Sequence, residues 1–539
     1  MLDPNLVLSL TVFTLIAVLY LRQRFSTRGT EYTWPLPPGP KRLPLIGNLL
    51  DMPKHLEWVT FRKWARDLGK TLALCRHPQL TTVPSSVSLD SDIIYLDLLG
   101  NHVIILDSFE AANDLLEKRS SRYSSRTQFT MANELVGWDF NFGFKAYGED
   151  WRQCRKLFHH EFHPVASRRF QPREIKATNQ FLRALLETPE NYVEHLRHMA
   201  GAITLGIAYG LDIKPHDDPY VKLSEQGVHA LLTATIPGAF LVDTLPFLKY
   251  VPAWFPGAGF QKKAKEWREL ATIMRDMPFQ AAKQAFTEGT DGTSFTYSRL
   301  AKINSESDVE LEEKYIKSVA GTMYAAGADS TVSALAFFIL AMLHNPSALA
   351  KGQEEIDRVV GNDRLPDFSD EESLPYISAI VKEVLRWDSV TPIAIPHLST
   401  TDDVYKGYFI PAGTMIIPNA WSMLHDENHY PDPFAFNPDR FMKDGKLDKS
   451  VKDPAAAAFG FGRRICPGRY MAFQSVWIAV ASMVATLDIK KAVDEHGNTI
   501  EPSGEHVSTL VCMPAPFKCS IKARSASAVA LIQSTEKDQ

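Results

Sequence analysis

The sequence predicts a mainly helical protein with a small β region, preceded by one N-terminal transmembrane helix. Residues 310–344 keep an apolar pattern without proline, which is unusually long for a globular helix and indicates a central one. Residues 395–418 alternate short β-rich runs with turns such as I-P-A-G-T, which is typical of a small β region. Residues 6–21 form an apolar run broken only by one serine and two threonines, as expected for a membrane anchor.

The composition indicates one large domain over residues 49–523. The chain has 539 residues, of which 45% are hydrophobic, and this is ample for a large core. Length alone would favour roughly three or four domains, but residues 50–520 contain no Gly/Ser linker or internal repeat. The net charge of −5 argues against a nucleic-acid binder. The five cysteines are scattered and odd in number, which favours a reducing compartment over a disulfide framework.

We predict that residues 1–24 are a retained membrane anchor. At ~1.5 Å per residue the apolar run reaches ~24 Å, close to the ~27 Å of a thin endoplasmic-reticulum bilayer. A cleaved signal peptide is the alternative, but it would carry its positive charge before the apolar run. Here Arg22, Arg24 and Arg28 come after it. This arrangement predicts a single-pass anchor in the endoplasmic reticulum membrane with the following domain in the cytoplasm.

Two further segments flank the large domain. Residues 25–48 are basic and proline-rich, and prolines at this density favour stiff extended chain, so we expect a hinge or linker. Residues 524–539 are small and polar with one short apolar patch, and we expect a disordered tail.

Apolar spacing predicts the remaining elements in order. Two strands should flank the turn L-G-N, and several helices separated by proline and glycine should fill residues 165–290. The predicted strands are 93–98 and 102–106, and the predicted helices are 56–67, 109–118, 310–344, 353–360, 374–387 and an apolar helix that begins at 469.

The loop F-G-F-G-R-R-I-C-P-G carries the most informative residue, Cys466. A lone cysteine in an apolar run is ordinarily structural, but this one precedes a predicted helix, where backbone N–H groups favour a thiolate. A thiolate in a fixed loop is a good axial ligand for a haem iron. Around it, Phe459 can lie against the sulfur, Gly462 allows a tight turn, Arg464 can reach a haem propionate, and Gly468 permits close approach of a flat macrocycle.

The pattern F-x-x-G-x-R-x-C-x-G resembles the haem-binding signature of the cytochrome P-450 family. The resemblance implies the cytochrome P-450 fold, which is a helical bundle around a long central helix over haem, as the catalytic domain. It also implies haem b (iron-protoporphyrin IX) as the cofactor, with Cys466 as the axial ligand of its iron and with Phe459, Arg464 and Gly468 as cofactor-binding residues.

The long helix contains the polar interruption A-A-G-A-D-S-T. A solvent-facing helix surface is the ordinary explanation, but both flanks read as buried, and local rules broken in a core often mark function. The segment is similar to the oxygen-activation motif of the family. The similarity places Gly327 at the dioxygen groove, makes Asp329 the acid, and puts Ser330 where threonine is usual. Thr331 points about 100° away around the helix and is a weaker catalytic candidate.

Glu383 and Arg386 form an E-x-x-R pair on one predicted helix face. Taken alone, it could be a surface pair worth a few tenths of a kcal/mol. The pair precedes F-N-P-D-R-F and then the cysteine loop, in the order that the family requires. The resemblance therefore joins Glu383, Arg386 and Arg440 into a buried structural triad that supports the loop beneath the haem.

Trp151 and Arg155 lie four residues apart on a predicted helix, where an exposed cation–π pair is the ordinary alternative. The resemblance assigns both side chains to a haem propionate. It gives His397 the same role from the β region, although a lone histidine is often structural. Together with Arg464 these residues would offset the two propionate charges.

The resemblance implies a monooxygenase that hydroxylates, or otherwise oxidises, a hydrophobic small molecule with dioxygen. No G-x-G-x-x-G follows a strand, so electrons must come from a separate protein. For a membrane-anchored member, the resemblance implies that they come from NADPH through a separate FAD/FMN reductase, the NADPH-cytochrome P-450 reductase. Lys156, Arg463 and Arg469 could receive this partner. The residues at these motif positions are similar to those of fungal biosynthetic members of the family, and this similarity suggests a role in secondary metabolism.

Two other functions stay open from the sequence. One is an oxygen-independent haem-thiolate isomerase or dehydratase, and the other is a non-catalytic haem-binding sensor. By resemblance, the substrate pocket should come from apolar stretches. These stretches are residues 126–144, 228–255, 323–328, 390–395 and 507–510.

Overall fold

The computed structural model describes residues 34–76, 91–215, 217–236, 238–290 and 292–536. The predicted membrane anchor, residues 1–24, lies outside the described residues, as does the first part of the predicted hinge. Helices dominate the described chain, and small sheets lie at its edges, so the mainly helical class with a small β region is confirmed.

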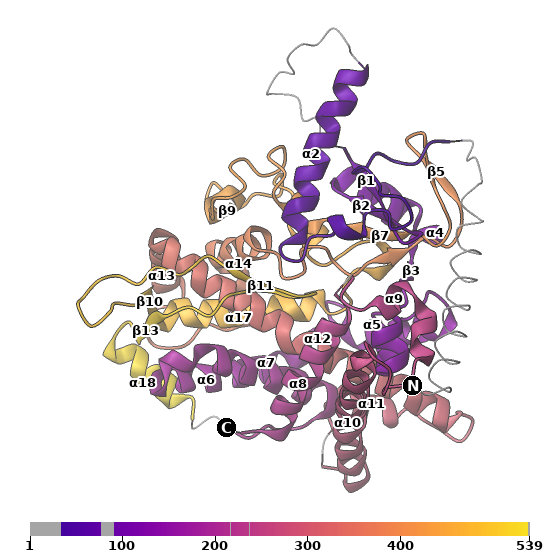
Figure 1. The fold of residues 1–539 in the computed structure, drawn as a ribbon. Helices are drawn as coiled ribbons and strands as arrows, with labels where there is room; N and C mark the ends of the chain where they lie inside the picture. The colour runs from indigo at the N-terminus through magenta and orange to yellow at the C-terminus, as the bar shows by residue number, and fades with distance from the viewer. Residues whose placement is uncertain (1–33, 77–90, 216, 237, 291, 537–539) are drawn as a thin grey trace.

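Helices of nine residues or more make up most of the fold (Figure 1). They are α2 (Glu57–Arg76), α5 (Glu149–Phe162), α6 (Gln171–Glu187), α7 (Tyr192–Tyr209), α8 (Pro219–Ala234), α10 (Gly259–Glu288), α12 (Val309–His344), α13 (Pro346–Val359), α14 (Pro375–Trp387), α17 (Arg469–Thr486) and α18 (Ala526–Ser534). The shorter α-helices are α3 (Phe109–Ala112), α4 (Ser120–Tyr123), α9 (Leu241–Thr244), α11 (Phe295–Leu300), α15 (Ala420–Leu424) and α16 (Ala455–Ala458).

Short 3-10 and π helices connect these elements. They are η2 (Leu49–Asp51), η3 (Asn113–Lys118), η4 (Thr130–Leu135), η5 (Trp138–Phe140), η6 (Ala166–Phe170), η7 (Pro189–Asn191), η8 (Pro246–Tyr250), η9 (Phe368–Ser373), η10 (Pro438–Phe441) and η11 (Gly462–Arg464). The helix predicted over residues 109–118 is in fact α3 followed directly by η3.

One five-stranded sheet has the order β1-β2-β7-β4-β3, and only its β2–β7 pair is parallel. Its strands are β1 (Ile93–Leu98), β2 (Asn101–Leu106), β7 (Met415–Pro418), β4 (His397–Leu398) and β3 (Ser125–Arg126). Four two-stranded sheets pair β5 (Asp403–Tyr405) with β6 (Tyr408–Ile410), β8 (Met442–Lys443) with β9 (Lys446–Leu447), β10 (Leu487–Lys491) with β13 (Cys519–Ala523), and β11 (His506–Ser508) with β12 (Cys512–Pro514).

Helix α12 begins one residue before the predicted start and ends at the predicted residue. It packs against α5, α7, α8, α10, α14 and α17, so it is the central helix of the bundle. Within the described ranges it is the one helix long and apolar enough to span a membrane. Because 78% of its most apolar window is buried inside the protein, its apolar character belongs to the core.

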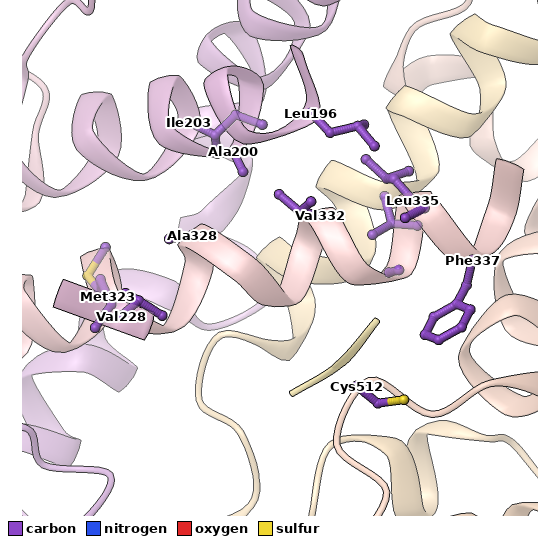
Figure 2. Close-up of a cluster of buried hydrophobic side chains, with 14 of the residues drawn as sticks. Leu196, Ala200, Ile203, Val228, Met323, Ala328, Val332, Leu335, Phe337 and Cys512 are labelled. Atoms are coloured by element: carbon purple, nitrogen blue, oxygen red, sulfur yellow. The ribbon is translucent and has the colours of Figure 1, made fainter. Parts of the chain in front are cut away.

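Small residues let α7 and α12 approach closely. Figure 2 shows Ala328 and Val332 of α12 facing Ala200 and Ile203 of α7. A Cβ atom at Gly327 would come within 2.2 Å of the Cγ2 atom of Thr204 on α7. The glycine therefore fits the close packing of the two helices, and its expected place at the dioxygen groove stays a prediction.

The proline-rich segment from residue 34 lies against the sheets. The carbonyl of Pro35 accepts from Phe409 N at 2.8 Å, and the carbonyl of Pro38 accepts from Tyr95 N at 2.8 Å. A Cβ atom at Gly39 would lie 1.9 Å from the carbonyl oxygen of Tyr95. The described part of the expected hinge is thus fastened to the domain.

The C-terminal segment is also ordered where disorder was expected. Helix α18 is capped by the Ser525 hydroxyl, which accepts from Ala528 N, and it buries Ala528 and Ile532. It packs against α6, α17 and β13. The expectation of a disordered tail over residues 524–539 is wrong for α18, because its short apolar patch forms one buried helix face.

Candidate active site

The cysteine loop has the conformation that its sequence suggested. Cys466 lies between η11 and α17, and its backbone N–H donates to the carbonyl of Phe459 at 2.8 Å. Gly462 has a φ of +58°, and a Cβ atom there would lie 1.9 Å from the carbonyl oxygen of Leu116. Only glycine satisfies both conditions. Gly468 is the residue before α17, so the sulfur stands at a helix N-terminus.

Burial raises the pKa of the Cys466 thiol above its ordinary value. The backbone N–H of Gly468 and the charges of Arg155 and Arg469 act in the opposite direction. The local groups therefore favour a thiolate, as expected, but burial outweighs them. A cationic metal at the sulfur would supply the missing stabilisation of the anion.

Four buried or half-buried basic groups gather beside this loop. Arg464 is buried, and its guanidinium carbon lies 4.4 Å from the ring centroid of Trp151. Its Nε and Nη2 atoms donate to the carbonyls of Ser124 and Lys145, each at 2.6 Å. Arg155 donates from Nη1 to the carbonyl of Ile465 at 2.7 Å.

Arg126 and His397 face each other across the β3–β4 pair. Arg126 is buried and donates to the carbonyls of Gly143 at 3.1 Å and Ile395 at 2.5 Å. His397 Nδ1 lies 2.8 Å from the carbonyl of Tyr123. The sequence reasoning placed Arg126 only at the start of a pocket stretch and missed its membership of this basic group.

The basic group has no carboxylate partner among the described residues. Burial lowers the pKa of Arg126 to about 9, and burial together with the charges of Arg126 and Arg155 lowers that of Arg464 to about 8. Burial and Arg126 hold the pKa of His397 well below its usual range. Their hydrogen bonds go to backbone carbonyls. So many buried cationic groups require an anion.

These residues fit a haem. Its two propionates would supply the missing negative charge to Arg126 and Arg464, and the neutral His397 could donate a hydrogen bond to one of them. The buried hydroxyl of Ser124 has no hydrogen-bond partner among the described residues and lies in the residue whose carbonyl binds Arg464. The residues of the loop and the start of α17, from 465 to 474, are half-buried within an otherwise buried interior. Cys466 would hold the iron, and no other group of three or more potential ligands suited to a metal occurs in the described ranges.

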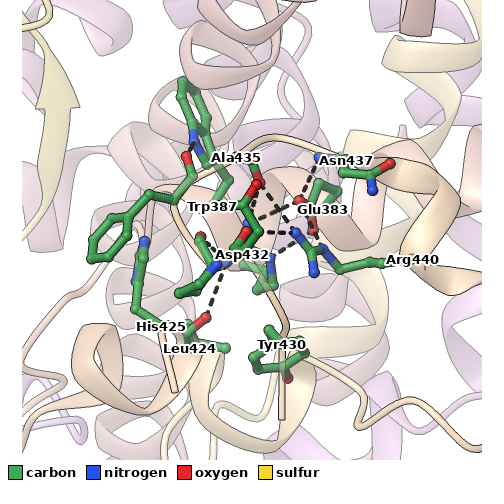
Figure 3. A network of polar contacts seen from close by, with 12 residues as sticks. Glu383, Trp387, Leu424, His425, Tyr430, Asp432, Ala435, Asn437 and Arg440 are labelled. Carbon is green, nitrogen blue, oxygen red and sulfur yellow. Dashed lines mark hydrogen bonds and ion pairs between the residues drawn. The ribbon is translucent and has the colours of Figure 1, made fainter. Parts of the chain in front are cut away.

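Glu383, Arg386 and Arg440 meet in one buried network (Figure 3). Both oxygens of Glu383 accept from Arg386, at 2.7 and 2.8 Å, and its Oε1 atom accepts from Arg440 Nε at 3.2 Å. Asn437 N donates to the same Oε1 atom at 2.7 Å. Glu383 and Arg386 are fully buried.

The network fastens the segment that leads into the cysteine loop. Arg386 donates to the carbonyls of Leu424 at 3.1 Å and Pro433 at 2.6 Å, so it binds the backbone between α15 and η10. From this segment, the Tyr430 hydroxyl donates to the carbonyl of Lys452 at 3.1 Å. Helix α16 follows immediately and ends one residue before Phe459. These hydrogen bonds thus connect Glu383, through Arg386 and the segment between α15 and α16, to the chain that enters the cysteine loop.

The polar residues of α12 differ in exposure. Ala326 is exposed and Asp329 and Ser330 are half-buried, whereas Thr331 is buried. The Ser330 hydroxyl donates to the carbonyl of Ala326 at 2.8 Å. Burial raises the pKa of Asp329, and the charges of Arg197 and His229 oppose this rise. An acid that holds its proton more tightly than usual beside a hydroxyl can pass protons.

A C-terminal hairpin closes the other side of α12. Cys512 N donates to the carbonyl of Val390 at 2.9 Å, and the Ser333 hydroxyl donates to the carbonyl of Cys512 at 2.5 Å. These bonds bring residues 507–510 close to the stretch that begins at Val390 and to α12. Two of the predicted pocket stretches, residues 390–395 and 507–510, therefore lie near each other and near Ser333 of α12.

The comparison with known sequences agrees with this arrangement. The family model described as Cytochrome P-450 matches residues 90–520, and the chain belongs to the cytochrome P-450 family. It is a fungal member and an oxidoreductase of the monooxygenase class. The family implies a haem cofactor, a redox partner, dioxygen and a small-molecule substrate.

Three fungal relatives are similar over nearly their whole length. Cytochrome P-450 monooxygenase 98 of Postia placenta is 43% identical, covering 99% of this chain and 98% of its own. Cytochrome P-450 monooxygenase ple1 of Rhodocybe pseudopiperita is 42% identical, covering 92% and 91%. Tryptamine 4-monooxygenase of Psilocybe cyanescens is 40% identical, covering 91% and 93%.

Proposed function

We propose that the protein is a membrane-anchored haem-thiolate monooxygenase that hydroxylates, or otherwise oxidises, a hydrophobic small molecule in fungal secondary metabolism. Electrons come from NADPH through a separate FAD/FMN reductase. The anchor over residues 1–24 holds the domain on the cytoplasmic side of the endoplasmic reticulum. The observation that carries the proposal is Cys466 just before α17, beside a buried basic group that has no carboxylate partner in the described part of the chain.

The residues around the cysteine loop hold the cofactor. Five side chains bind and orient the propionates. They are Arg126 on β3, Arg464 on η11, His397 on β4, and Trp151 and Arg155 on α5. When bound, the haem supplies an iron that activates dioxygen, and electron density from the thiolate assists cleavage of the O–O bond. The basic residues also make the site selective for a dianionic macrocycle, because each propionate offsets a buried positive charge.

Asp329 and Ser330 move protons on the opposite side. Burial raises the pKa of Asp329, so its carboxyl group binds a proton more tightly than an exposed aspartate does. The Ser330 hydroxyl, which donates to the Ala326 carbonyl, is one residue from Asp329 and passes the proton on. The pair favours an oxygen-dependent monooxygenase over an isomerase or dehydratase, which needs no proton relay to dioxygen.

Replacement of Ser330 by alanine should raise the ratio of peroxide released to product formed by about tenfold, as loss of a general acid predicts. The matched control is Ser330→Thr, which keeps the hydroxyl and restricts its rotamer, and it should keep the ratio at or below that of the wild type. Peroxide and product are measured per NADPH consumed. An unchanged ratio in Ser330→Ala would assign the relay to Thr331 or to water.

Reconstitution with a fungal diflavin reductase separates the candidate functions. The proposal predicts NADPH consumption that depends on substrate and dioxygen, and a product larger by one oxygen atom. A panel of terpenoid, polyketide and indole compounds is suitable, and tryptamine belongs in it because one relative is named as a tryptamine 4-monooxygenase. Haem binding without NADPH consumption across the panel would favour the sensor, and product formation without dioxygen would favour the isomerase.

A further inference from the structure

Two buried hydroxyl groups of α12, outside the candidate active site, bind the backbone of one loop. Ser318 and Thr322 lie four residues apart and therefore on the same face of the helix. The Ser318 hydroxyl donates to the carbonyl of Phe140, and the Thr322 hydroxyl accepts from Phe142 N at 3.1 Å. Residues 140–145, which follow η5 on the way to α5, are thus fastened to the central helix.

Both hydroxyl groups are fully engaged in the interior. The Thr322 hydroxyl also donates to the carbonyl of Ser318 at 2.6 Å. The Ser318 hydroxyl accepts from the thiol of Cys154 on α5 at 3.5 Å, so Ser318 joins α5, α12 and the loop. All three side chains are buried. Removing one hydroxyl would leave its backbone partner in the loop buried and unpaired, which is the costly way to lose a hydrogen bond.

The other side of the loop binds the buried basic group. The carbonyl of Phe142 accepts from Arg464 Nη1 at 3.4 Å, and that of Lys145 accepts from Arg464 Nη2 at 2.6 Å. The carbonyl of Gly143 accepts from Arg126 Nε at 3.1 Å. The single residue Phe142 therefore offers its N–H to α12 and its carbonyl to an arginine of the basic group.

A closed turn connects the two sides of the loop. The carbonyl of Asn141 accepts from Phe144 N at 3.1 Å, and its side-chain Oδ1 atom accepts from Gly143 N at 2.9 Å. Asn141 is itself buried. Because two hydrogen bonds close this turn, a displacement at Phe142 would also move the carbonyls that bind the two arginines.

We propose that Ser318 and Thr322 are positioning residues that hold loop 140–145 and thereby set the places of Arg126 and Arg464 at the cofactor. Their effect passes through the loop backbone. The proposal rests on the proposed function in one respect, which is that a haem propionate is the anion for the two arginines. When the loop is fixed in advance, less ordering is left to the step in which the cofactor binds.

Thr322→Val tests the proposal in the full-length haem-loaded protein. Valine has nearly the shape of threonine but has no hydroxyl, so the buried Phe142 N–H loses its acceptor. Loss of one buried hydrogen bond should make haem transfer to excess apomyoglobin about fivefold faster. The propionate-bending band of the resonance Raman spectrum should also shift. Thr322→Ser restores the hydroxyl and should return both readouts toward those of the wild type.

Ser333→Ala is the matched control on the same helix. Ser333 is fully buried, and its hydroxyl donates to the carbonyl of Cys512 in the C-terminal hairpin. The control removes an equivalent hydrogen bond from α12 but leaves loop 140–145 in place. It should therefore leave the propionate-bending band unshifted, even where it lowers the stability of the protein.

Ser318→Ala is the second test variant, and it removes the bond to the Phe140 carbonyl. It should shift the same band, so the proposal can be tested even if Thr322→Val fails to fold. An unshifted band with wild-type haem transfer, in whichever of the two variants folds, would overturn the proposal. An equal shift in Ser333→Ala would also overturn it, because any lost bond of α12 would then have the same effect.

The state of the wild-type protein separates this proposal from the proposed function. A wild-type protein that binds no haem would overturn both of them. A haem-loaded wild type with the thiolate spectrum, together with unaltered variants, would overturn the positioning role alone and leave the monooxygenase proposal standing.

Discussion

Glu383→Gln should lower the free energy of unfolding by about 3–5 kcal/mol and weaken haem retention. The carboxylate is fully buried and receives bonds from Arg386, Arg440 and Asn437 N. Removing its charge leaves two guanidinium groups unpaired in the interior, which is the costly way to break a buried ion pair. Denaturant unfolding of the full-length protein and the haem-to-protein ratio after gel filtration measure the two effects.

The matched control is Lys382→Gln on the same helix. Lys382 pairs with Asp453, whose side chain is half exposed, so its loss should cost at most about 1 kcal/mol. If Glu383→Gln lowered the free energy of unfolding no more than Lys382→Gln does, the network would contribute no more than a surface ion pair and would not support the cysteine loop.

Cys466→Ser should abolish monooxygenase turnover while the fold persists. The backbone bond from residue 466 to the Phe459 carbonyl does not involve the side chain, so the loop keeps its conformation. A serine hydroxyl is much less acidic than a thiol and cannot provide the anionic sulfur ligand. NADPH-dependent product formation with a reductase measures turnover, and far-ultraviolet circular dichroism reports on the fold.

Cys519→Ser is the control for this variant. Both cysteines are free and half-buried, but Cys519 lies on β13, away from the loop. Its replacement should leave turnover unchanged within about twofold, because a modest change in a half-buried side chain acts on stability more than on chemistry. If Cys466→Ser retained turnover, Cys466 would not be part of the active site.

Local patterns were sufficient for the parts of the fold that local interactions determine. The α12 pattern and the β1 strand were predicted to within one residue, because long periodic runs specify both their type and their length. The contact of Glu383 with Arg386 follows from their spacing on a helix. Arg440 could be joined to them only through the family resemblance, since the contact spans 57 residues.

Long-range contacts and burial account for what the sequence could not reveal. Arg126 joins the basic group because β3 pairs with β4, and no local pattern specifies that pairing. The raised pKa of Cys466 arises from burial, which outweighs the helix N-terminus that the sequence did indicate. The packing of Gly327 against Thr204 of α7 is likewise a long-range contact that its motif did not indicate. Helix α18 escaped prediction because it is short and its burial depends on contacts with α6, α17 and β13 that no local pattern specifies.

The carbon monoxide difference spectrum of the reduced full-length protein tests the central claim most directly. If Cys466 ligates a haem iron as the thiolate, the spectrum must show the red-shifted Soret band that is characteristic of the family, and Cys466→Ser must lose it while Cys519→Ser keeps it. A wild-type spectrum without that band, or the band retained in Cys466→Ser, would contradict the account.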